Sequence, residues 1–342
     1  MFNNKKTFKK ILTVFITLTV TYFAIIAYMI FSNEPSFDSQ STHEMTAKEI
    51  EDLGFEQHYQ SESTQFTVRD KAILTAQHFM NNSDLSVVVL HGILSSSYTN
   101  NRFAGLIREA ANAEVYALDL RGHGSSEGNP GDVSYIGQYV DDVADVIKQI
   151  KKSKPEGKII IAGHSMGGGI SLRYAMKENV PDIDGYLLFA PQLGDNAPTN
   201  VWPDDAARQQ DESFMAIDIS RLIGLALLNS LNITKWHDMP VFFFNLPAEM
   251  GLNKYSFRST ASMSPNDYKQ GLQSVDKPLL VIVGENDEAF NASAYQTAID
   301  TYSKGKFHMI KGQTHNGVRH DVLAMKQVKE WIKSNQLDRK VK

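Results

Sequence analysis

The sequence contains no cysteine among its 342 residues. Disulfide bonds, thiolate nucleophiles and cysteine-ligated metal sites are therefore excluded. It also lacks an excess of charge of one sign, because 34 lysine and arginine residues stand against 39 aspartate and glutamate residues, for a net charge of −5. This mild balance provides no basic surface for a phosphate backbone, so we expect no nucleic-acid partner. Internal repeats and low-complexity tracts are absent as well.

One long apolar run lies near the amino terminus. Residues 11–31 carry no charge, and as a helix they span roughly 30 Å, the thickness of one hydrocarbon core. Four lysines precede the run, whereas acidic residues follow it. Since lysines stay on the cytoplasmic side, we predict a cytoplasmic basic tail at 1–10 and a single-pass anchor in the cell membrane at 11–31. The remaining chain then lies on the extracytoplasmic side. A cleaved secretion signal is the alternative.

The rest of the chain alternates between strands and helices after a polar tether at 32–61, which contains one expected short helix at 47–53. The expected strands are 65–69, 72–79, 86–90, 114–118, 158–162, 186–190, 279–283 and 306–310. The expected helices are 100–111, 136–151, 166–177, 292–302 and 322–334. This alternation predicts an α/β fold with a mostly parallel sheet and helices on both faces, formed by residues 62–192 and 277–342.

The alternation is interrupted at residues 193–276, a stretch far longer than an ordinary connection. It includes apolar residues at helical spacing over 217–231 and an aromatic run at 241–244. We predict an inserted cap. Two compatible interpretations are a small subdomain with its own core and a lid whose apolar residues line an acyl site.

A β-branched strand ends in Gly-x-Ser-x-Gly at residues 163–167, and helix-forming residues follow. Strand, tight turn and helix in this order are typical of a nucleophile elbow, which holds a serine in a strained backbone conformation. Gly163 and Gly167 lack the Cβ that would clash with the neighbouring strand or helix. Ser165 is therefore the predicted nucleophile. The alternative is an ordinary serine in a glycine-rich turn.

A serine hydroxyl needs a base to remove its proton. Of ten histidines, His315 is the best placed, because its loop follows the last predicted strand. That loop falls at the carboxyl edge of the sheet, the same edge as Ser165. His308 lies inside a predicted strand and His320 at a helix start, so both are worse placed.

The base in turn needs a carboxylate that holds its tautomer. The strand at 279–283 runs into a polar loop containing three carboxylates. Asp287 is the predicted acid, with Glu285 and Glu288 as competitors that would otherwise lie exposed on the loop rim.

Two backbone N–H groups should form the oxyanion site. One belongs to Met166, the residue after the predicted nucleophile. The other is expected from the loop that follows the strand at 86–90, where Ile93 is the best donor and Gly92 permits a close backbone approach. We expect His91 to support this loop rather than to titrate in catalysis.

The loop at 119–128, Asp-Leu-Arg-Gly-His-Gly-Ser-Ser-Glu-Gly, and the segment at 163–168, Gly-His-Ser-Met-Gly-Gly, together resemble the lysophospholipase and monoacylglycerol-lipase branch of the α/β-hydrolase superfamily. This branch is often grouped with serine aminopeptidase-like hydrolases. The resemblance covers about residues 66–332. It implies Ser165, Asp287 and His315 as the catalytic triad, in the order found in α/β-hydrolases, and Ile93 and Met166 as oxyanion donors.

The resemblance also implies a cap between the sixth and seventh strands, where the long insertion lies. The sequence departs from many members of this branch in its amino-terminal anchor, because many relatives are soluble. Without the resemblance, the loop at 119–124 would be interpreted as a structural turn.

These features together predict a membrane-anchored serine hydrolase that cleaves carboxylic esters. We expect a lipid or other acyl ester as substrate, an acyl-enzyme at Ser165, and no metal or cofactor. An aminopeptidase or amidase with the same triad is the second hypothesis, and it would use cap carboxylates for the substrate amino group: Asp204, Asp205, Asp211 and Glu212. A catalytically silent binding module of the cell envelope is the third. The sequence carries no signal for oligomeric state.

Overall fold

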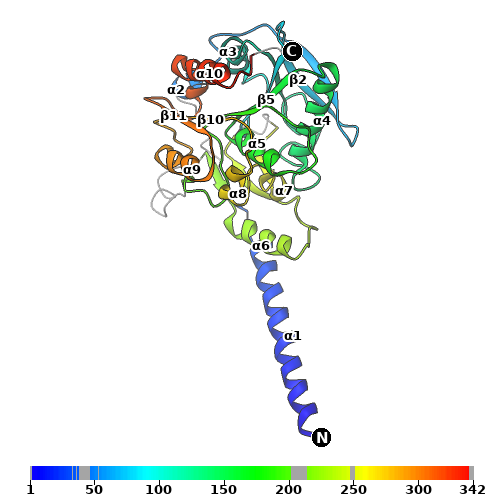
Figure 1. The fold of residues 1–342 in the computed structure, drawn as a ribbon. Helices are drawn as coiled ribbons and strands as arrows, with labels where there is room; N and C mark the ends of the chain where they lie inside the picture. The colour runs from blue at the N-terminus through cyan, green and yellow to red at the C-terminus, as the bar shows by residue number, and fades with distance from the viewer. Residues whose placement is uncertain are drawn as a thin grey trace.

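The computed structural model describes residues 2–32, 34–35, 37, 47–52, 54–201, 214–246 and 251–338. An eight-stranded sheet forms the centre of the folded domain, and one long helix projects from the domain (Figure 1). The strand order is β1-β2-β4-β3-β5-β6-β10-β11. Strand β2 runs antiparallel to both of its neighbours, and the other pairs are parallel. The predicted α/β class with a mostly parallel sheet is confirmed.

The strands of the central sheet are β1 (Glu62–Thr67), β2 (Ile73–Phe79), β3 (Leu85–Leu90), β4 (Glu114–Leu118), β5 (Lys158–His164), β6 (Gly185–Phe189), β10 (Leu279–Gly284) and β11 (Lys306–Ile310). The helices outside the insertion are α1 (Phe2–Phe31), α2 (Ala47–Asp52), α3 (Asn101–Ala111), α4 (Gln138–Ser153), α5 (Met166–Met176), α9 (Tyr295–Tyr302) and α10 (Val322–Ser334). Two short 3-10 helices are η3 (Ala292–Ala294) and η4 (Gly317–His320).

Both faces of the sheet are covered, which explains why the central strands are apolar along their whole length. Successive side chains of a strand point to opposite faces. In β5, Ile159 and Ile161 belong to the core that includes α4 and α5, whereas Ile160 belongs to the core that includes α3 and α10. The carboxyl ends of the parallel strands therefore lie at one edge, between two packed helical layers.

The insertion at 193–276 follows β6 and precedes β10, the sixth and seventh strands of the central sheet. Its elements are β7 (Met215–Ile217), α6 (Ile219–Ser230), β8 (Pro240–Phe244), β9 (Lys254–Ser256), α7 (Phe257–Thr260) and α8 (Tyr268–Gln273). Strands β7, β8 and β9 form a separate antiparallel sheet. Val241 packs with α6 in a small core, whereas Phe244 and Tyr255 join the main core.

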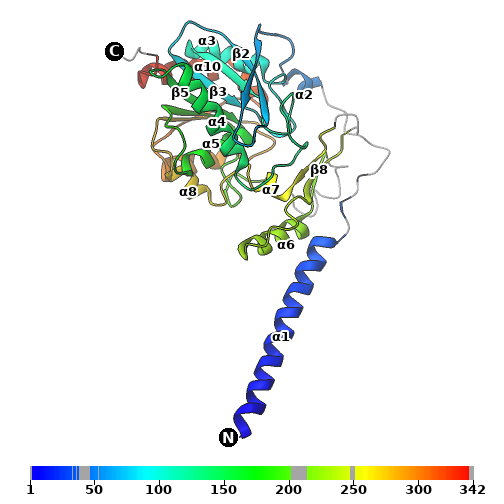
Figure 2. The same cartoon turned by 90° about the vertical axis from the view of Figure 1, so that its right-hand side faces the viewer.

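Helix α1 begins well before the predicted anchor, because lysines are good helix formers and do not interrupt a helix. Within its stretch Lys5–Phe31, an 18-residue window has a mean hydropathy of 2.2, and the stretch is long and apolar enough to cross a membrane. Figures 1 and 2 show α1 extending away from the folded domain.

Part of the expected tether is attached to the domain. The predicted short helix is present as α2, although position 53 lies outside the described residues. The buried carboxylate of Asp52 accepts a hydrogen bond from Thr314 Oγ1 at 2.5 Å, and Arg319 donates to the Asp52 carbonyl at 3.4 Å. The tether thus contacts the domain directly beside His315.

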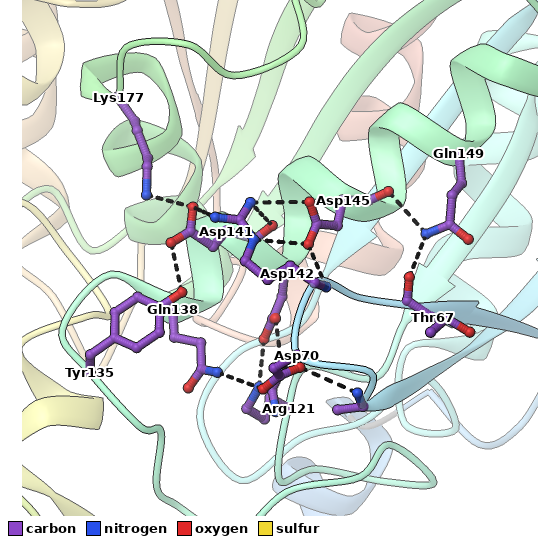
Figure 3. Close-up of polar contacts among 12 residues, drawn as sticks. Thr67, Asp70, Arg121, Tyr135, Gln138, Asp141, Asp142, Asp145, Gln149 and Lys177 are labelled. Atoms are coloured by element: carbon purple, nitrogen blue, oxygen red, sulfur yellow. Dashed lines mark hydrogen bonds and ion pairs between the residues drawn. The ribbon is translucent and has the colours of Figure 1, made fainter.

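A cluster of ion pairs joins the β1–β2 turn, the loop after β4 and helix α4 (Figure 3). Arg121 donates to both carboxylate oxygens of Asp142 at 2.8 Å and to Asp70 at 3.0 Å. Arg121 and Asp142 are buried, and burial raises the pKa of the Asp142 carboxyl despite its partner. Arg69 donates to Asp145 at 2.9 Å, but its side chain is 46% exposed.

We expect Arg121→Ala to lower the free energy of unfolding by about 3–5 kcal/mol, because the buried Asp142 carboxylate would lose its partner. Arg69→Ala is the matched control in the same cluster and should cost below about 1 kcal/mol. The Arg69 side chain is half-exposed, and its buried partner Asp141 keeps an ion pair with Lys177. Urea unfolding of the full chain in detergent micelles, followed by circular dichroism, measures both values. Equal losses would contradict the view that burial sets the strength of these pairs.

Candidate active site

Ser165 lies at the sharp turn between β5 and α5. Its backbone has φ +54° and ψ −118°, which is rare for a residue with a side chain and is typical of strained functional positions. A Cβ on Gly163 would lie 2.4 Å from the Gly167 carbonyl oxygen, and a Cβ on Gly167 would lie 2.2 Å from the Leu90 carbonyl oxygen. Both glycines are therefore required by backbone contacts, and the turn has the geometry expected of an elbow.

His315 and Asp287 meet at the carboxyl edge of the sheet. His315 Nδ1 lies 3.0 and 2.9 Å from the two carboxylate oxygens of Asp287. The Asp287 side chain is fully buried, and its Oδ1 accepts the N–H groups of Ala289 and Phe290, each at 2.9 Å. A carboxylate held this way faces a protonated Nδ1, so the neutral imidazole has its lone pair on Nε2.

The two competing carboxylates hold the backbone of the histidine loop. Glu288 Oε2 accepts the His315 N–H at 3.0 Å, and Glu285 Oε2 accepts the Gly312 N–H at 2.9 Å. Of the three carboxylates in this loop, Asp287 alone contacts the imidazole ring of His315 among the described residues.

His164, the residue before Ser165, connects the serine loop to the histidine loop. Its Nε2 lies 3.0 Å from the His315 carbonyl oxygen, and the two rings are 4.7 Å apart. Burial holds the pKa of His164 well below its ordinary value, so the ring is neutral and donates from Nε2. The hydrogen bond from the Ser165 hydroxyl to His315 is not among these contacts and stays a prediction. Sequence reasoning missed His164, because its position in Gly-x-Ser-x-Gly is variable.

The predicted oxyanion loop passes beside Ser165. A Cβ on Gly92 would lie 3.1 Å from Ser165 Cβ, so the loop reaches this position only because residue 92 is glycine. Met166 begins α5, where the first N–H groups have no intrahelical acceptor. Leu94 has φ +58°, and its N–H donates to the hydroxyl of Tyr255 at 2.8 Å.

Tyr255 comes from cap strand β9 and connects the cap to this loop. Its hydroxyl lies 2.9 Å from His123 Nε2, and His123 Nδ1 lies 2.9 Å from the Arg121 carbonyl oxygen. His123 therefore donates from Nδ1 and accepts from Tyr255. Sequence reasoning missed Tyr255 because no motif surrounds it.

Two buried histidines stabilise the loops around the site. His91 donates from Nδ1 to the Gly92 carbonyl at 2.7 Å and accepts the Leu120 N–H at Nε2 at 3.1 Å. Burial lowers the pKa of His91 to about 4 and that of His123 to about 3. His91 thus remains neutral and supports its loop, as the sequence suggested.

These two lowered pKa values predict loss of stability in acid. Unfolded histidine has a pKa of about 6.5, so the unfolded chain binds more protons below that value. The stability that these two neutral histidines contribute is complete above a pH of about 6.5. It is lost as the pH falls through their folded pKa values of about 4 and about 3, with a slope of about 2.7 kcal/mol per pH unit for the pair between these limits. Urea unfolding between pH 8 and 4.5 measures the slope. His91→Asn should reduce it by about 1.4 kcal/mol per pH unit, the share of one histidine, because buried His164 and His320 contribute to the same slope. A profile unchanged by the substitution would contradict the assignment.

The cap carboxylates of the aminopeptidase hypothesis, Asp204, Asp205, Asp211 and Glu212, lie outside the described residues. Within the part of the chain that the structure describes, no three histidine or acidic side chains gather as metal ligands.

Comparison with known proteins places residues 81–323 in the family described as serine aminopeptidase, S33. The chain is 26% identical over 237 residues to a monoacylglycerol lipase of Mycolicibacterium smegmatis. The matched region covers 66% of this chain and 80% of the relative. It is 23% identical over 231 residues to a protein of Haemophilus influenzae named for 2-succinyl-6-hydroxy-2,4-cyclohexadiene-1-carboxylate synthase, which covers 63% and 86%. The structure of Est1E from Butyrivibrio proteoclasticus, with bound ferulic acid, matches with a TM-score of 0.57 at 19% identity, over 80% of this chain and 99% of Est1E.

Proposed function

The chain belongs to the serine aminopeptidase S33 family of α/β-hydrolases, and on this premise we propose that it is a membrane-anchored serine hydrolase that cleaves carboxylic esters of lipids or other acyl compounds. The observation that carries the proposal is the Asp287–His315 pair, whose loop is hydrogen-bonded through His164 to the strained elbow that holds Ser165. The similarity to a monoacylglycerol lipase over 80% of that relative supports an acyl ester as substrate.

The reaction follows from the orientation of the imidazole. Asp287 accepts a hydrogen bond from the Nδ1–H of His315, which leaves Nε2 free to take the proton of the Ser165 hydroxyl. The serine oxygen attacks the ester carbonyl carbon, and the oxyanion is bound by the N–H groups of Ile93 and Met166. The tetrahedral intermediate expels the alcohol, which takes the proton from His315, and an acyl-enzyme remains. Water, deprotonated by His315, then releases the acid and regenerates the serine.

Tyr255 acts in this scheme by positioning the oxyanion loop. We expect Tyr255→Phe to lower kcat about tenfold with little change in KM. Leu94 loses its hydrogen-bond acceptor, so the neighbouring Ile93 N–H is held less precisely at the oxyanion. Steady-state kinetics with a short p-nitrophenyl ester measures the two constants. Tyr174→Phe removes a hydroxyl bonded to the Pro181 carbonyl, away from this loop, and serves as the matched control. An equal effect of both substitutions would show a general loss of packing instead.

The cap and α1 fit a lipid substrate. We propose that α1 anchors the chain in the cell membrane and that the folded domain lies on the extracytoplasmic side, since lysines precede the apolar run. The cap at 193–276 acts as a lid whose apolar surface receives the acyl chain, at about 25 cal/mol per Å² of apolar area removed from water.

A substrate panel tests the proposal. The full chain in detergent micelles is assayed with monoacylglycerols, lysophospholipids, short p-nitrophenyl esters and an aminoacyl p-nitroanilide. The expected result is turnover of the esters with little turnover of the anilide. The family description includes aminopeptidases, so preferential cleavage of the anilide would instead support the aminopeptidase hypothesis.

A further inference from the structure

Cap helix α6 packs across the carboxyl end of α1. Ile26 and Ile30 of α1 are only 2% and 1% exposed, and they share a core with Leu225 and Leu228 of α6. The helices approach closely at Gly224, where a Cβ would lie 2.8 Å from Ile30 Cγ1. Both views show α6 lying across the end of α1 (Figures 1 and 2). The end of α1 is therefore part of the folded cap.

Arg221 of α6 bonds the end of α1. It is buried, and its Nε donates to the Ile30 carbonyl at 2.9 Å, while Nη2 reaches the Ser32 carbonyl at 3.4 Å. Nη1 donates to Glu34 at 3.1 Å and to the Pro240 carbonyl at 2.9 Å. The last carbonyls of a helix lack intrahelical donors and favour a cation, so one guanidinium satisfies the end of α1 and joins it to β8.

The outer face of α6 carries no charge. Arg221 is the helix's one charged residue, and it points inward. The exposed positions of α6 share small or apolar side chains and fall at helical spacing: Ser220, Ile223, Ala226 and Ser230. Ile223 is 45% exposed, and Leu231, just past the helix, is 47% exposed. A helix that faces water ordinarily has charged residues on its outer side.

The position of α6 along α1 matches the depth of a lipid interface. The buried contact at Ile26 lies five residues before Phe31, which is about 7.5 Å along a helix and falls within the roughly 5–10 Å depth of interfacial helices. Trp236 packs edge-on against Phe31 with ring centres 5.6 Å apart, and Lys235 Nζ lies 5.2 Å from the Trp236 ring centre. Tryptophan and lysine are both typical of the membrane–water boundary.

We propose that the exposed face of α6 is a second membrane contact, inserted in the lipid interface on the side of the membrane where the folded domain lies, with Arg221 fixing α6 to the end of α1. This inference rests on the proposed role of α1 as a membrane anchor. The occupant of the face is the lipid bilayer, because the face is continuous with the helix that spans it. The cap is then held at the membrane surface and does not move freely on a tether.

The absence of native cysteine allows a direct test. Single variants Ile223→Cys and Leu231→Cys of the full chain are labelled with an NBD fluorophore and reconstituted in phosphatidylcholine vesicles that contain a lipid with a nitroxide in its acyl chain. Leu18→Cys on α1 reports insertion of the anchor, and Val322→Cys on α10 is an exposed control on the folded domain. Hydrolysis of a soluble ester by each variant reports that its fold is intact.

We expect the nitroxide lipid to quench the probes at 223 and 231 as strongly as the probe at 18, and to leave the probe at 322 bright. Quenching at 18 without quenching at 223 and 231 would overturn the inference and leave the anchor in place. Loss of quenching at all positions, 18 included, would show instead that the proposed anchor does not insert. Disulfide crosslinking between copies through position 223, without quenching there, would assign the face to a second copy of the chain and overturn the inference.

Discussion

Ser165→Ala is expected to lower kcat for ester hydrolysis by about 10⁴- to 10⁶-fold, since no other group replaces the attacking oxygen and the triad acts as a unit. The elbow itself should be preserved, because alanine retains the Cβ and places no new atom in the turn. KM should change little, because the cap and the oxyanion donors remain. The measurement combines steady-state kinetics with covalent labelling by a fluorophosphonate, which should modify the wild type and not the variant.

Ser171→Ala is the matched control for this experiment. Ser171 lies on the same helix, α5, where its hydroxyl donates to the Gly167 carbonyl at 2.7 Å. We expect this variant to remain active and to be labelled. If the fluorophosphonate labels neither the folded wild type nor folded Ser171→Ala, the result would favour the catalytically silent binding module. Labelling of Ser165→Ala would place the nucleophile at another residue.

Asp287→Asn is expected to lower kcat about 10⁴-fold with little loss of stability. The amide oxygen can still accept the N–H groups of Ala289 and Phe290. The amide nitrogen then faces His315 Nδ1 and donates to it, which moves the imidazole proton to Nε2. A ring protonated at Nε2 cannot accept the serine proton, so the base is lost while the geometry remains.

The control for Asp287→Asn is Glu285→Gln, the same carboxylate-to-amide change in the same loop. Glutamine can still accept the Gly312 N–H, and position 285 does not contact the imidazole ring. We expect Glu285→Gln to keep kcat within about tenfold of the wild type, as for loss of one exposed charge-assisted hydrogen bond. Similar losses in the two variants would contradict the assignment of Asp287 and indicate that the loop as a whole is disturbed. NMR of the His315 ring nitrogens would report the tautomer directly.

Several features could be predicted from local sequence because each depends on local physics. Residues 163–167 specify an elbow, since only glycine fits the backbone contacts at 163 and 167. The apolar run before Ser32 specifies a long helix by its composition. Strand β4 has the predicted bounds, and every one of its residues is buried. Helix α10 also has the predicted bounds, and the Asp321 side chain caps its first turn by accepting the N–H groups of Leu323 and Ala324.

Other boundaries shifted for physical reasons. Strand β1 was expected at 65–69 but spans Glu62–Thr67, because antiparallel pairing with β2 extends it into polar residues that a search for apolar runs leaves out. Helix α1 begins at Phe2, before the predicted start at residue 11. The lysines that precede the apolar run are good helix formers, and a search for apolar runs leaves them out.

The sequence by itself determined the α/β class, the order of the serine, acid and histidine loops, and the presence of an apolar amino-terminal helix. These follow from periodicity and from the rule that parallel strands bring their carboxyl ends to one edge. The tertiary structure decided which of three neighbouring carboxylates faces His315, that Tyr255 of the cap bonds the loop beside Ser165, and that Arg221 bonds the end of α1. Such contacts join residues far apart in the chain, and their partners are set by how the loops and the cap pack, which no local pattern encodes.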